Sequence, residues 1–146
     1  MSVSVFVDTN ILVYARDASE PEKQAIAMKW VAQLWQNRRG KISYQCLNEY
    51  YVTVTQRLKP GLTKEAARAD IKSLQTWNPT SVDEIVIECA WTIQDRYSFS
   101  WWDSLILSAA QKLDCQIILS EDMQNQQQVG NLQIINPFVS DISIIA

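Results

Sequence analysis

Short apolar segments that alternate with segments of helical periodicity constrain the fold of this chain more than any other feature. The segments expected to be strands are 3–7, 41–44, 116–119 and 132–135, with 80–82 as a further candidate. Between them, apolar residues recur at a spacing of about 3.6 residues, which is typical of helices. Apolar strands that alternate with helices indicate a parallel sheet covered on both faces. The sequence therefore predicts a single α/β domain, with a central parallel sheet of four or five strands flanked by helices.

Helix-breaking and capping residues mark the ends of the expected helices. Pro21 opens one helix and Gly40 stops it, whereas Pro60-Gly61 separates the next helix from one that Thr63 caps. Helices are expected over 11–16, 21–37, 46–58, 63–76, 81–97 and 101–113. The polar segment 124–130 is expected to be a loop.

Length and composition indicate one compact domain. The chain has 146 residues, of which 47% are apolar, and it has no repeats and no linker-like segment. We expect a domain over 1–138 and a C-terminal tail over 139–146, whose exposed apolar residues 142–145 could serve an interface or form a loose terminus. No apolar run approaches the ~20 residues of a membrane span, and no basic region precedes the first strand. A cytoplasmic protein without membrane contact is therefore expected.

The absence of histidine excludes several kinds of active site. Ser-His-Asp and Cys-His catalysis, His-paired ribonuclease chemistry and His-ligated zinc all need that side chain. Cys46, Cys89 and Cys115 are too widely separated for a metal or redox motif, so they are expected to be buried free thiols. The net charge of −3 provides no overall basic field for nucleic acid. Chemistry in this chain must use carboxylates, Lys, Tyr, Ser, Thr or a hard metal ion.

Two acidic residues directly follow predicted strands. Asp8 follows the first strand and Asp122 lies just beyond the strand at 116–119. Sites in open α/β sheets form beyond the carboxyl ends of the strands, so both positions suit a functional site. Each residue taken singly is equally well explained, Asp8 as a helix cap and Asp122 as a loop residue.

Two further acids lie on predicted helices. Asp103 is placed in the first turn of its helix, at the edge of a predicted core stripe that includes Trp102 and away from the polar side with Ser104 and Ser108. The helix dipole alone would favour an acid there. Glu49 falls opposite the apolar stripe of its helix, where a solvated glutamate is the usual occupant.

Five segments that follow one another along the chain share a pattern, and they are 5–14, 47–49, 100–104 with 109–110, 118–122 and 135–138. In this order they resemble segments of PIN-domain proteins, particularly VapC-type toxins, and the resemblance covers nearly the whole domain. It implies that Asp8, Glu49, Asp103 and Asp122 converge at one end of the sheet. Glu121 is a possible auxiliary acid or a solvated residue. Asp114-Cys115 departs from the family's pattern, which often has a glycine before this strand, but leaves the acids intact.

Four carboxylates held close together repel one another, so protonation or a cation must neutralise some of them. Because histidine and paired cysteines are lacking, an all-oxygen site suits Mg²⁺ or Mn²⁺. We expect Asp8, Asp103 and Asp122 to be metal ligands, with Glu49 as a second-metal or water-orienting ligand. Hydrogen bonds that hold the site are expected from Thr9, Asn10 or Ser120.

The resemblance implies a metal-dependent endoribonuclease that is the toxin of a type II toxin–antitoxin pair. Cleavage by a metal-activated water would leave a 5′-phosphate, and the protein would be a homodimer neutralised by a small antitoxin that covers the site. Two alternatives stay open. One is a non-catalytic interaction module on the same fold, which loss of an acid would favour. The other is phosphotransfer through Asp8, although the second acid of that chemistry is replaced by Asn10.

RNA binding needs cations and surfaces that accept bases. The densest basic stretch contains Arg57, Lys59, Lys64, Arg68 and Lys72. Lys64, Arg68 and Lys72 are expected to share one helix face. Such a face could bind RNA, or it could simply be a charged surface in contact with water. Tyr97, Trp101 and Trp102 could stack on single-stranded bases, although core packing is expected for Trp102.

Overall fold

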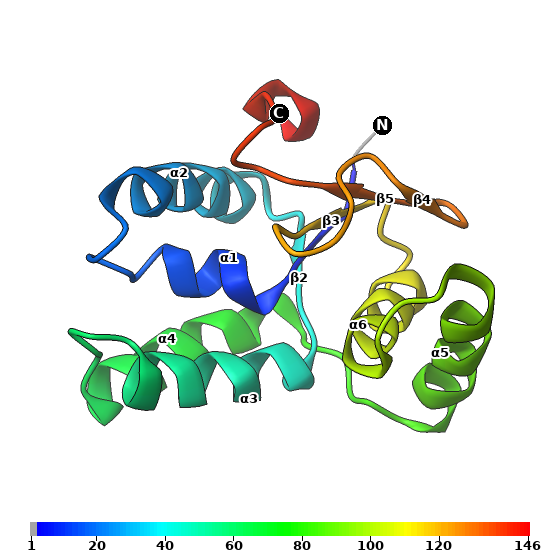
Figure 1. Ribbon diagram of the computed structural model, residues 1–146. Helices are drawn as coiled ribbons and strands as arrows, with labels where there is room; N and C mark the ends of the chain where they lie inside the picture. The colour runs from blue at the N-terminus through cyan, green and yellow to red at the C-terminus, as the bar shows by residue number, and fades with distance from the viewer. Residues whose placement is uncertain (1–2) are drawn as a thin grey trace.

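The structure is a computed structural model that describes residues 3–146. Within these residues, a central sheet is formed by β1 (Val5–Val7), β2 (Gly40–Lys41), β3 (Ile117–Leu119), β4 (Gln128–Val129) and β5 (Leu132–Ile135). Its strand order is β2-β1-β3-β5-β4, and all neighbours are parallel except β4 and β5 (Figure 1). The predicted α/β class and largely parallel sheet are confirmed.

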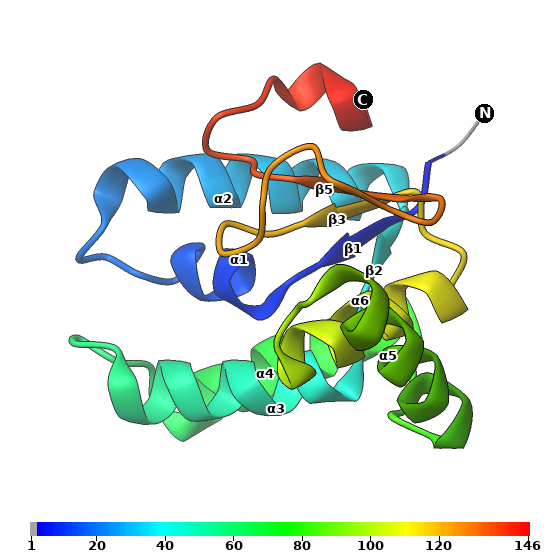
Figure 2. The ribbon, with the colours of Figure 1, turned by 45° about the vertical axis from the view of Figure 1, so that its right-hand side comes forward.

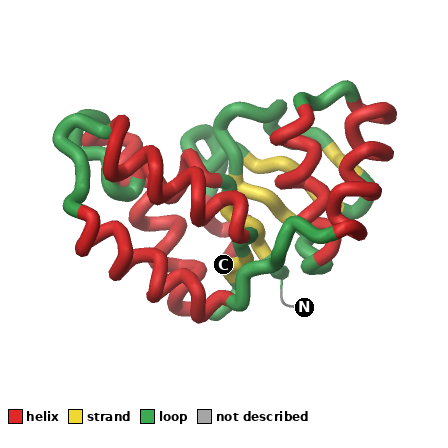
Figure 3. The backbone as a smooth tube through the Cα atoms, turned by 90° about the horizontal axis from the view of Figure 1, so that it is seen from below, coloured by secondary structure: helices red, strands yellow, loops and turns green. Residues whose placement is uncertain are grey.

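Helices cover the sheet on both sides, as Figures 2 and 3 show. The α-helices are α1 (Thr9–Tyr14), α2 (Pro21–Asn37), α3 (Tyr44–Val52), α4 (Lys64–Leu74), α5 (Glu84–Tyr97) and α6 (Trp101–Lys112). Other helical turns are η1 (Thr53–Arg57), η2 (Gln75–Trp77) and η3 (Ile142–Ile145). In Figure 2, α3 to α6 lie below the strands, whereas α2 lies above these helices, at the height of β3 and β5. Both faces of the central strands are thereby shielded from water, and for this reason β1 and β3 consist entirely of buried apolar residues.

The parallel pairing of β1 with β3 positions the residues that follow both strands. Val7 pairs with Leu119, and the next amide, that of Asp8, donates to the Leu119 carbonyl at 3.0 Å. The two chain segments therefore leave the sheet side by side, at its carboxyl edge. No helix within residues 3–146 is long and apolar enough to cross a membrane.

Three segments differ from the sequence prediction. The second strand is shorter than 41–44 because Ser43 already caps α3, accepting from the Cys46 amide at 3.4 Å. Segment 80–82 is not a strand and contributes only a bridge between Thr80 and Ser43. The expected loop 124–130 contains β4, which turns back onto β5 through Gly130 in a left-handed conformation (φ 61°).

Several side chains also lie elsewhere than predicted. Cys46 and Cys115 are buried, but Cys89 is exposed. Ser104 and Ser108 are buried because α6 packs against α5, and the Ser108 hydroxyl donates to the Val86 carbonyl at 2.7 Å. The apolar C-terminal residues are not a free tail. They form η3 beside α2, where Ile145 is 1% exposed and its carbonyl accepts from the Asn37 amide group at 3.2 Å.

Gly40 is the position at which an added methyl group is expected to cost most in the sheet. A Cβ atom there would lie 2.5 Å from the Trp77 ring, which packs against Trp35 with 5.0 Å between ring centroids. We expect Gly40→Ala to lower the free energy of unfolding by about 1–3 kcal/mol. Denaturant unfolding would measure this, with Trp77→Leu as the paired background. An equal penalty in both backgrounds would show that the clash is not its cause.

Candidate active site

Asp8 lies at the point where β1 passes into α1. Its backbone is extended (φ −69°, ψ 153°), and its carboxylate caps α1 by accepting from the Thr9 amide at 2.7 Å. The second carboxylate oxygen accepts from the Ser120 hydroxyl at 2.8 Å. Asp8 is 5% exposed and Ser120 is fully buried. The capping role that the sequence offered is therefore present, but the contact with Ser120 also ties Asp8 to the end of β3.

The other three acids come from separate elements. Asp122 follows β3, and the Asn10 amide donates to it at 2.8 Å. Asp103 lies in the first turn of α6, where its amide donates to the Ser100 hydroxyl at 3.1 Å, and Glu49 lies on α3. All four carboxylates line one cavity of about 740 Å³. Thr9 and Asn10 line it too.

The electrostatics of this cavity, here called the acid cavity, follow from burial and from like charges. Burial is the largest cause of the rise in the pKa of Asp8 to about 7, and the charges of Asp103 and Glu49 add to it against the opposing hydrogen bonds. The pKa of Asp103 is raised by burial and by Asp122. The pKa of Glu49 is raised because neighbouring groups remove part of the water around its carboxyl group, and the negative charge of Asp103 raises it further. The charges of these carboxylates therefore repel one another, although the residues are far apart in the sequence.

Glu121 also lines the acid cavity, but it has partners of its own. The Tyr14 hydroxyl donates to it at 2.7 Å, and the Lys23 ammonium group is 2.5 Å from its other oxygen. This ammonium group also lies 4.9 Å from the centre of the Tyr14 ring. The sequence suggested that Glu121 is either an auxiliary acid or a solvated residue. Neither interpretation predicted this ion pair. No local signal could have identified it, since Lys23 is distant in the chain.

The donor set of the acid cavity fits a hard divalent cation. Its candidate ligands are carboxylate, hydroxyl and amide oxygens, which Mg²⁺ and Mn²⁺ prefer. The Thr9 hydroxyl and the Asn10 amide oxygen are buried without a hydrogen-bond partner among the described residues. No three acidic or cysteine side chains of residues 3–146 are close enough together to hold one ion between them. The fit is therefore to an ion bound through one or two carboxylates and water, as is usual for Mg²⁺.

The basic residues proposed for RNA do not lie together. Arg57, at the end of η1, is the one cation among the described residues that line the acid cavity. Lys64, Arg68 and Lys72 are exposed on α4 and do not line it. Arg68 donates to the Tyr51 hydroxyl at 3.2 Å.

The predicted aromatic residues have different surroundings. The Tyr97 hydroxyl accepts from the Gly130 amide at 3.2 Å, and Trp101 packs partly against the core. Trp102 was expected in the core, but it is 65% exposed and lines the acid cavity. The prediction for Trp102 is wrong because its side chain lies on the face of α6 that borders the acid cavity, whereas the neighbouring Trp101 packs against the core.

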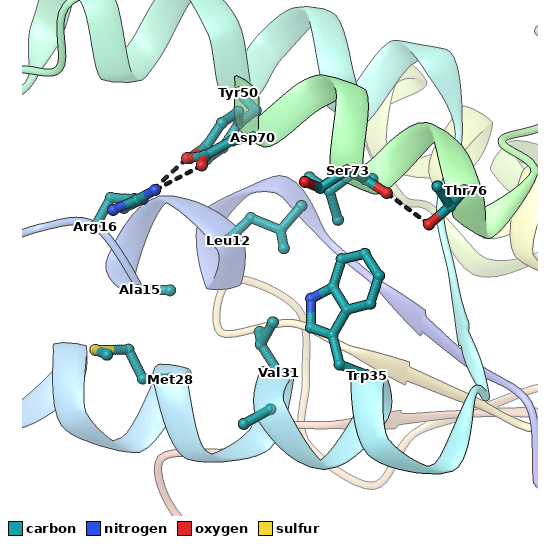
Figure 4. A pocket seen from close by; sticks show the side chains of 12 residues that line it. Leu12, Ala15, Arg16, Met28, Val31, Trp35, Tyr50, Asp70, Ser73 and Thr76 are labelled. Carbon is teal, nitrogen blue, oxygen red and sulfur yellow. Dashed lines mark hydrogen bonds and ion pairs between the residues drawn. The ribbon is translucent and has the colours of Figure 1, made fainter. Parts of the chain in front are cut away.

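A second cavity, of about 610 Å³, lies between α2 and α4 and has mostly apolar walls (Figure 4). One end is closed by a network that joins the turn after α1 to α3 and α4. The Arg16 guanidinium group donates to both oxygens of Asp70, at 2.9 and 2.5 Å, and the Tyr50 hydroxyl donates to Asp70 at 2.5 Å.

Loss of Asp70 is expected to destabilise the fold. Asp70→Ala would leave the Tyr50 hydroxyl, on a side chain that is 2% exposed, without this partner. The ion pair adds little, because 47% of the Arg16 side chain is exposed to water. We expect a loss of about 1–3 kcal/mol in thermal unfolding. Asp95→Ala, on the exposed side of α5, is the matched control, and equal melting temperatures for the two variants would refute the prediction.

Comparisons with known proteins agree with this architecture. Residues 5–131 match the sequence profile of the PIN domain. A toxin–antitoxin complex from Klebsiella pneumoniae superposes with a TM-score of 0.65 and 16% identity, over 92% of this chain and 98% of that chain. VapC20 of Mycobacterium tuberculosis, a sarcin–ricin loop cleaving toxin, superposes with a TM-score of 0.63 and 22% identity, over 82% and 90% of the two chains.

No curated protein matches the sequence. The profile match nevertheless spans well over half of the chain, and it includes the strand that precedes Asp8 and the two helices and strand that carry the remaining acids. The chain therefore belongs to the PIN-domain family.

Proposed function

We propose that the chain is a divalent-metal-dependent endoribonuclease that acts as the toxin of a type II toxin–antitoxin pair. The observation that carries the proposal is the acid cavity. Four carboxylates from β1, α3, α6 and the end of β3 line one open cavity, and the pKa of the most buried, Asp8, is raised to about 7. Burial of Asp8 beside three further carboxylates is costly for folding, so a functional ligand of opposite charge is the simplest reason for the arrangement.

The four acids divide two roles between them in this proposal. Asp8, Asp103 and Asp122 hold the cation, directly or through water, and Glu49 orients the attacking water or holds a second ion. The cation supplies a more acidic bound water and neutralises charge on the phosphodiester. Ser120 fixes the orientation of Asp8, and Asn10 that of Asp122, through the hydrogen bonds described above. Thr9 contributes its amide to Asp8 and a hydroxyl that remains free to bind a ligand.

RNA as the substrate is supported by the family and by the chemistry of the cavity. VapC20, a structural neighbour, is a sarcin–ricin loop cleaving toxin. Arg57 borders the acids, where it can contact a phosphate that the carboxylates alone would repel. Lys64, Arg68 and Lys72 lie on an exposed helix and would contact more distant phosphates. Cleavage is proposed to leave a 5′-phosphate.

A cognate antitoxin and a second copy of the chain are the proposed protein partners. The antitoxin proposal is supported by the neighbour from Klebsiella pneumoniae, which is a toxin–antitoxin complex. In this proposal the antitoxin covers the acid cavity, and the toxin acts as a homodimer in the cytoplasm. Co-purification of a small protein encoded next to this chain, with loss of RNA cleavage in the complex, would test the antitoxin. Light scattering of the toxin alone would test the dimer.

Cleavage of RNA by the antitoxin-free protein tests the proposed function. Total RNA is incubated with Mg²⁺ or Mn²⁺, or with EDTA, and the product ends are mapped. We expect cleavage with either cation, none with EDTA, and 5′-phosphate products. Asp95→Asn, an exposed acid on α5 outside the cavity, is the matched control and should cleave like the wild type. Cleavage that persists in EDTA would overturn the metal-dependent mechanism.

A further inference from the structure

Trp102 is the most exposed aromatic side chain of the described residues, and the core does not account for it. It is 65% exposed, whereas the next most exposed tryptophan, Trp91, is 53% exposed. Burial of a large apolar side chain stabilises the folded state, and Trp102 contributes little of this stabilisation because most of its surface contacts water. A side chain of this size at the mouth of a cavity therefore has a role outside the core.

The backbone of Trp102 is held next to the acids. Trp102 precedes Asp103 in the first turn of α6, where the Ser100 hydroxyl accepts from the Asp103 amide at 3.1 Å and the Ser100 carbonyl accepts from the Ser104 hydroxyl at 2.8 Å. The Trp102 carbonyl accepts from the side chain of Gln45 on α3 at 3.4 Å. These contacts place the start of the Trp102 side chain in the same helical turn as Asp103.

The acid cavity has an apolar wall as well as its carboxylates. Trp102 and Ile106 are one turn apart on α6, and Val13 of α1 and Val52 of α3 also line the cavity. Val52 is itself 37% exposed. A cavity that offers metal ligands, one arginine and an exposed indole ring matches a ligand with a charged part and a flat apolar part. A nucleotide of single-stranded RNA has both in adjacent positions.

We propose that Trp102 stacks on an unpaired base next to the phosphate that is cleaved. This inference rests on the proposed function, because it names a residue with which the same cavity binds its RNA substrate. A base within a duplex is stacked on its neighbours and cannot cover the indole ring without being unpaired. Trp102 is thus a binding residue that positions one base of the substrate, and it takes no part in proton transfer.

A second copy of the chain is the competing occupant of this surface. Ile85 and Trp91 on α5 are also exposed, at 61% and 53%, and could form part of an interface between copies. They do not line the acid cavity, whereas Trp102 does. Its sharing of a cavity with the four acids and Arg57 favours the nucleic acid as its partner.

Binding of two oligomers with equal charge tests the proposal. Both oligomers carry a fluorescein label. One is an oligoadenylate, and the other is an abasic ribose-phosphate oligomer of the same length. Both are titrated by fluorescence anisotropy in an Asp8→Asn background, so that the readout does not depend on cleavage. Removal of one stacked base contact is expected to lower the affinity about tenfold, which corresponds to about 1.4 kcal/mol. We expect Trp102→Ala to weaken oligoadenylate binding about tenfold and to leave binding of the abasic oligomer unchanged.

Two further variants separate stacking from structure. Trp102→Phe keeps an aromatic ring and should recover most of the affinity, whereas Trp91→Ala removes an exposed tryptophan outside the cavity and should change nothing. Equal weakening of both oligomers by Trp102→Ala, or no weakening, overturns the inference. Conversion of a dimer to a monomer by Trp102→Ala in light scattering, with an unchanged preference for oligoadenylate, places Trp102 in a subunit interface and also overturns it. The proposed function is tested separately, by the cleavage assay on total RNA. If the wild-type protein shows no metal-dependent cleavage there, the proposed function is refuted.

Discussion

Asp8→Asn is expected to lower the rate of RNA cleavage by about a thousandfold. The substitution keeps the size and the cap of α1 but removes the negative charge at the centre of the acid cavity. A bound cation contributes several kcal/mol to the stabilisation of charge in phosphodiester cleavage, and each 1.36 kcal/mol corresponds to about tenfold in rate. Single-turnover cleavage of a labelled RNA at saturating Mn²⁺ measures the loss.

The control for this experiment is Asp95→Asn, which should cleave at the wild-type rate. Asp122→Asn removes an acid that is more exposed than Asp8 and should also lose most of the activity. If Asp8→Asn keeps more than about a tenth of the wild-type rate, Asp8 cannot be a ligand of the cation that cleavage needs.

The same substitution is expected to stabilise the metal-free protein at alkaline pH. The pKa of Asp8 is about 7 in the folded protein and 3.8 is its ordinary value, so the folded state holds a proton that the unfolded state has released. The resulting stability is complete below about pH 4 and is lost as the pH rises through about 7. The difference corresponds to up to about 4 kcal/mol, and the neutral amide of the variant does not titrate in this range. We therefore expect Asp8→Asn to exceed the wild type in free energy of unfolding at pH 8.

Urea unfolding of both proteins in EDTA between pH 5 and pH 8 measures this effect. The raised pKa values of Glu49 and Asp103 act in the same direction, whereas the lowered values of Asp83, Glu121 and Asp141 oppose it. All of these groups remain in both proteins, so the difference between the two curves reports the titration of Asp8 together with its coupling to Asp103 and Glu49. A difference that stays constant over this pH range would contradict the raised pKa of Asp8.

The fold could be predicted where a local pattern coincided with a tertiary constraint. The apolar segment before Asp8 is buried on both faces, and Pro21 begins α2 at the predicted residue. The hairpin of β4 and β5 could not be predicted, because Gln128 and its neighbours are polar and their pairing depends on the turn at Gly130. Thr80 has the pattern of a strand residue, but it meets only a single partner, Ser43.

The candidate site was predictable to differing degrees. Asp8 and Asp122 follow from their positions after parallel strands, because such strand ends meet at one edge of a sheet. Periodicity argued against Glu49, which points away from the apolar stripe of its helix, and the family resemblance alone selected it. Trp102 was assigned to the core because the helical pattern of α6 cannot show which of its faces borders the acid cavity. The Trp102 side chain lies on that face, whereas the neighbouring Trp101 packs against the core.

The central claim is that the carboxylates of the acid cavity together form a divalent-cation site. Isothermal titration calorimetry with Mn²⁺ at pH 8 tests it most directly, with the wild type beside Asp8→Asn, Asp103→Asn, Asp122→Asn and the control Asp95→Asn. We expect saturable binding to the wild type and the control, and affinity at least about tenfold lower in each of the other three variants. Absence of Mn²⁺ binding to the wild type, or equal binding to all five proteins, would contradict the claim.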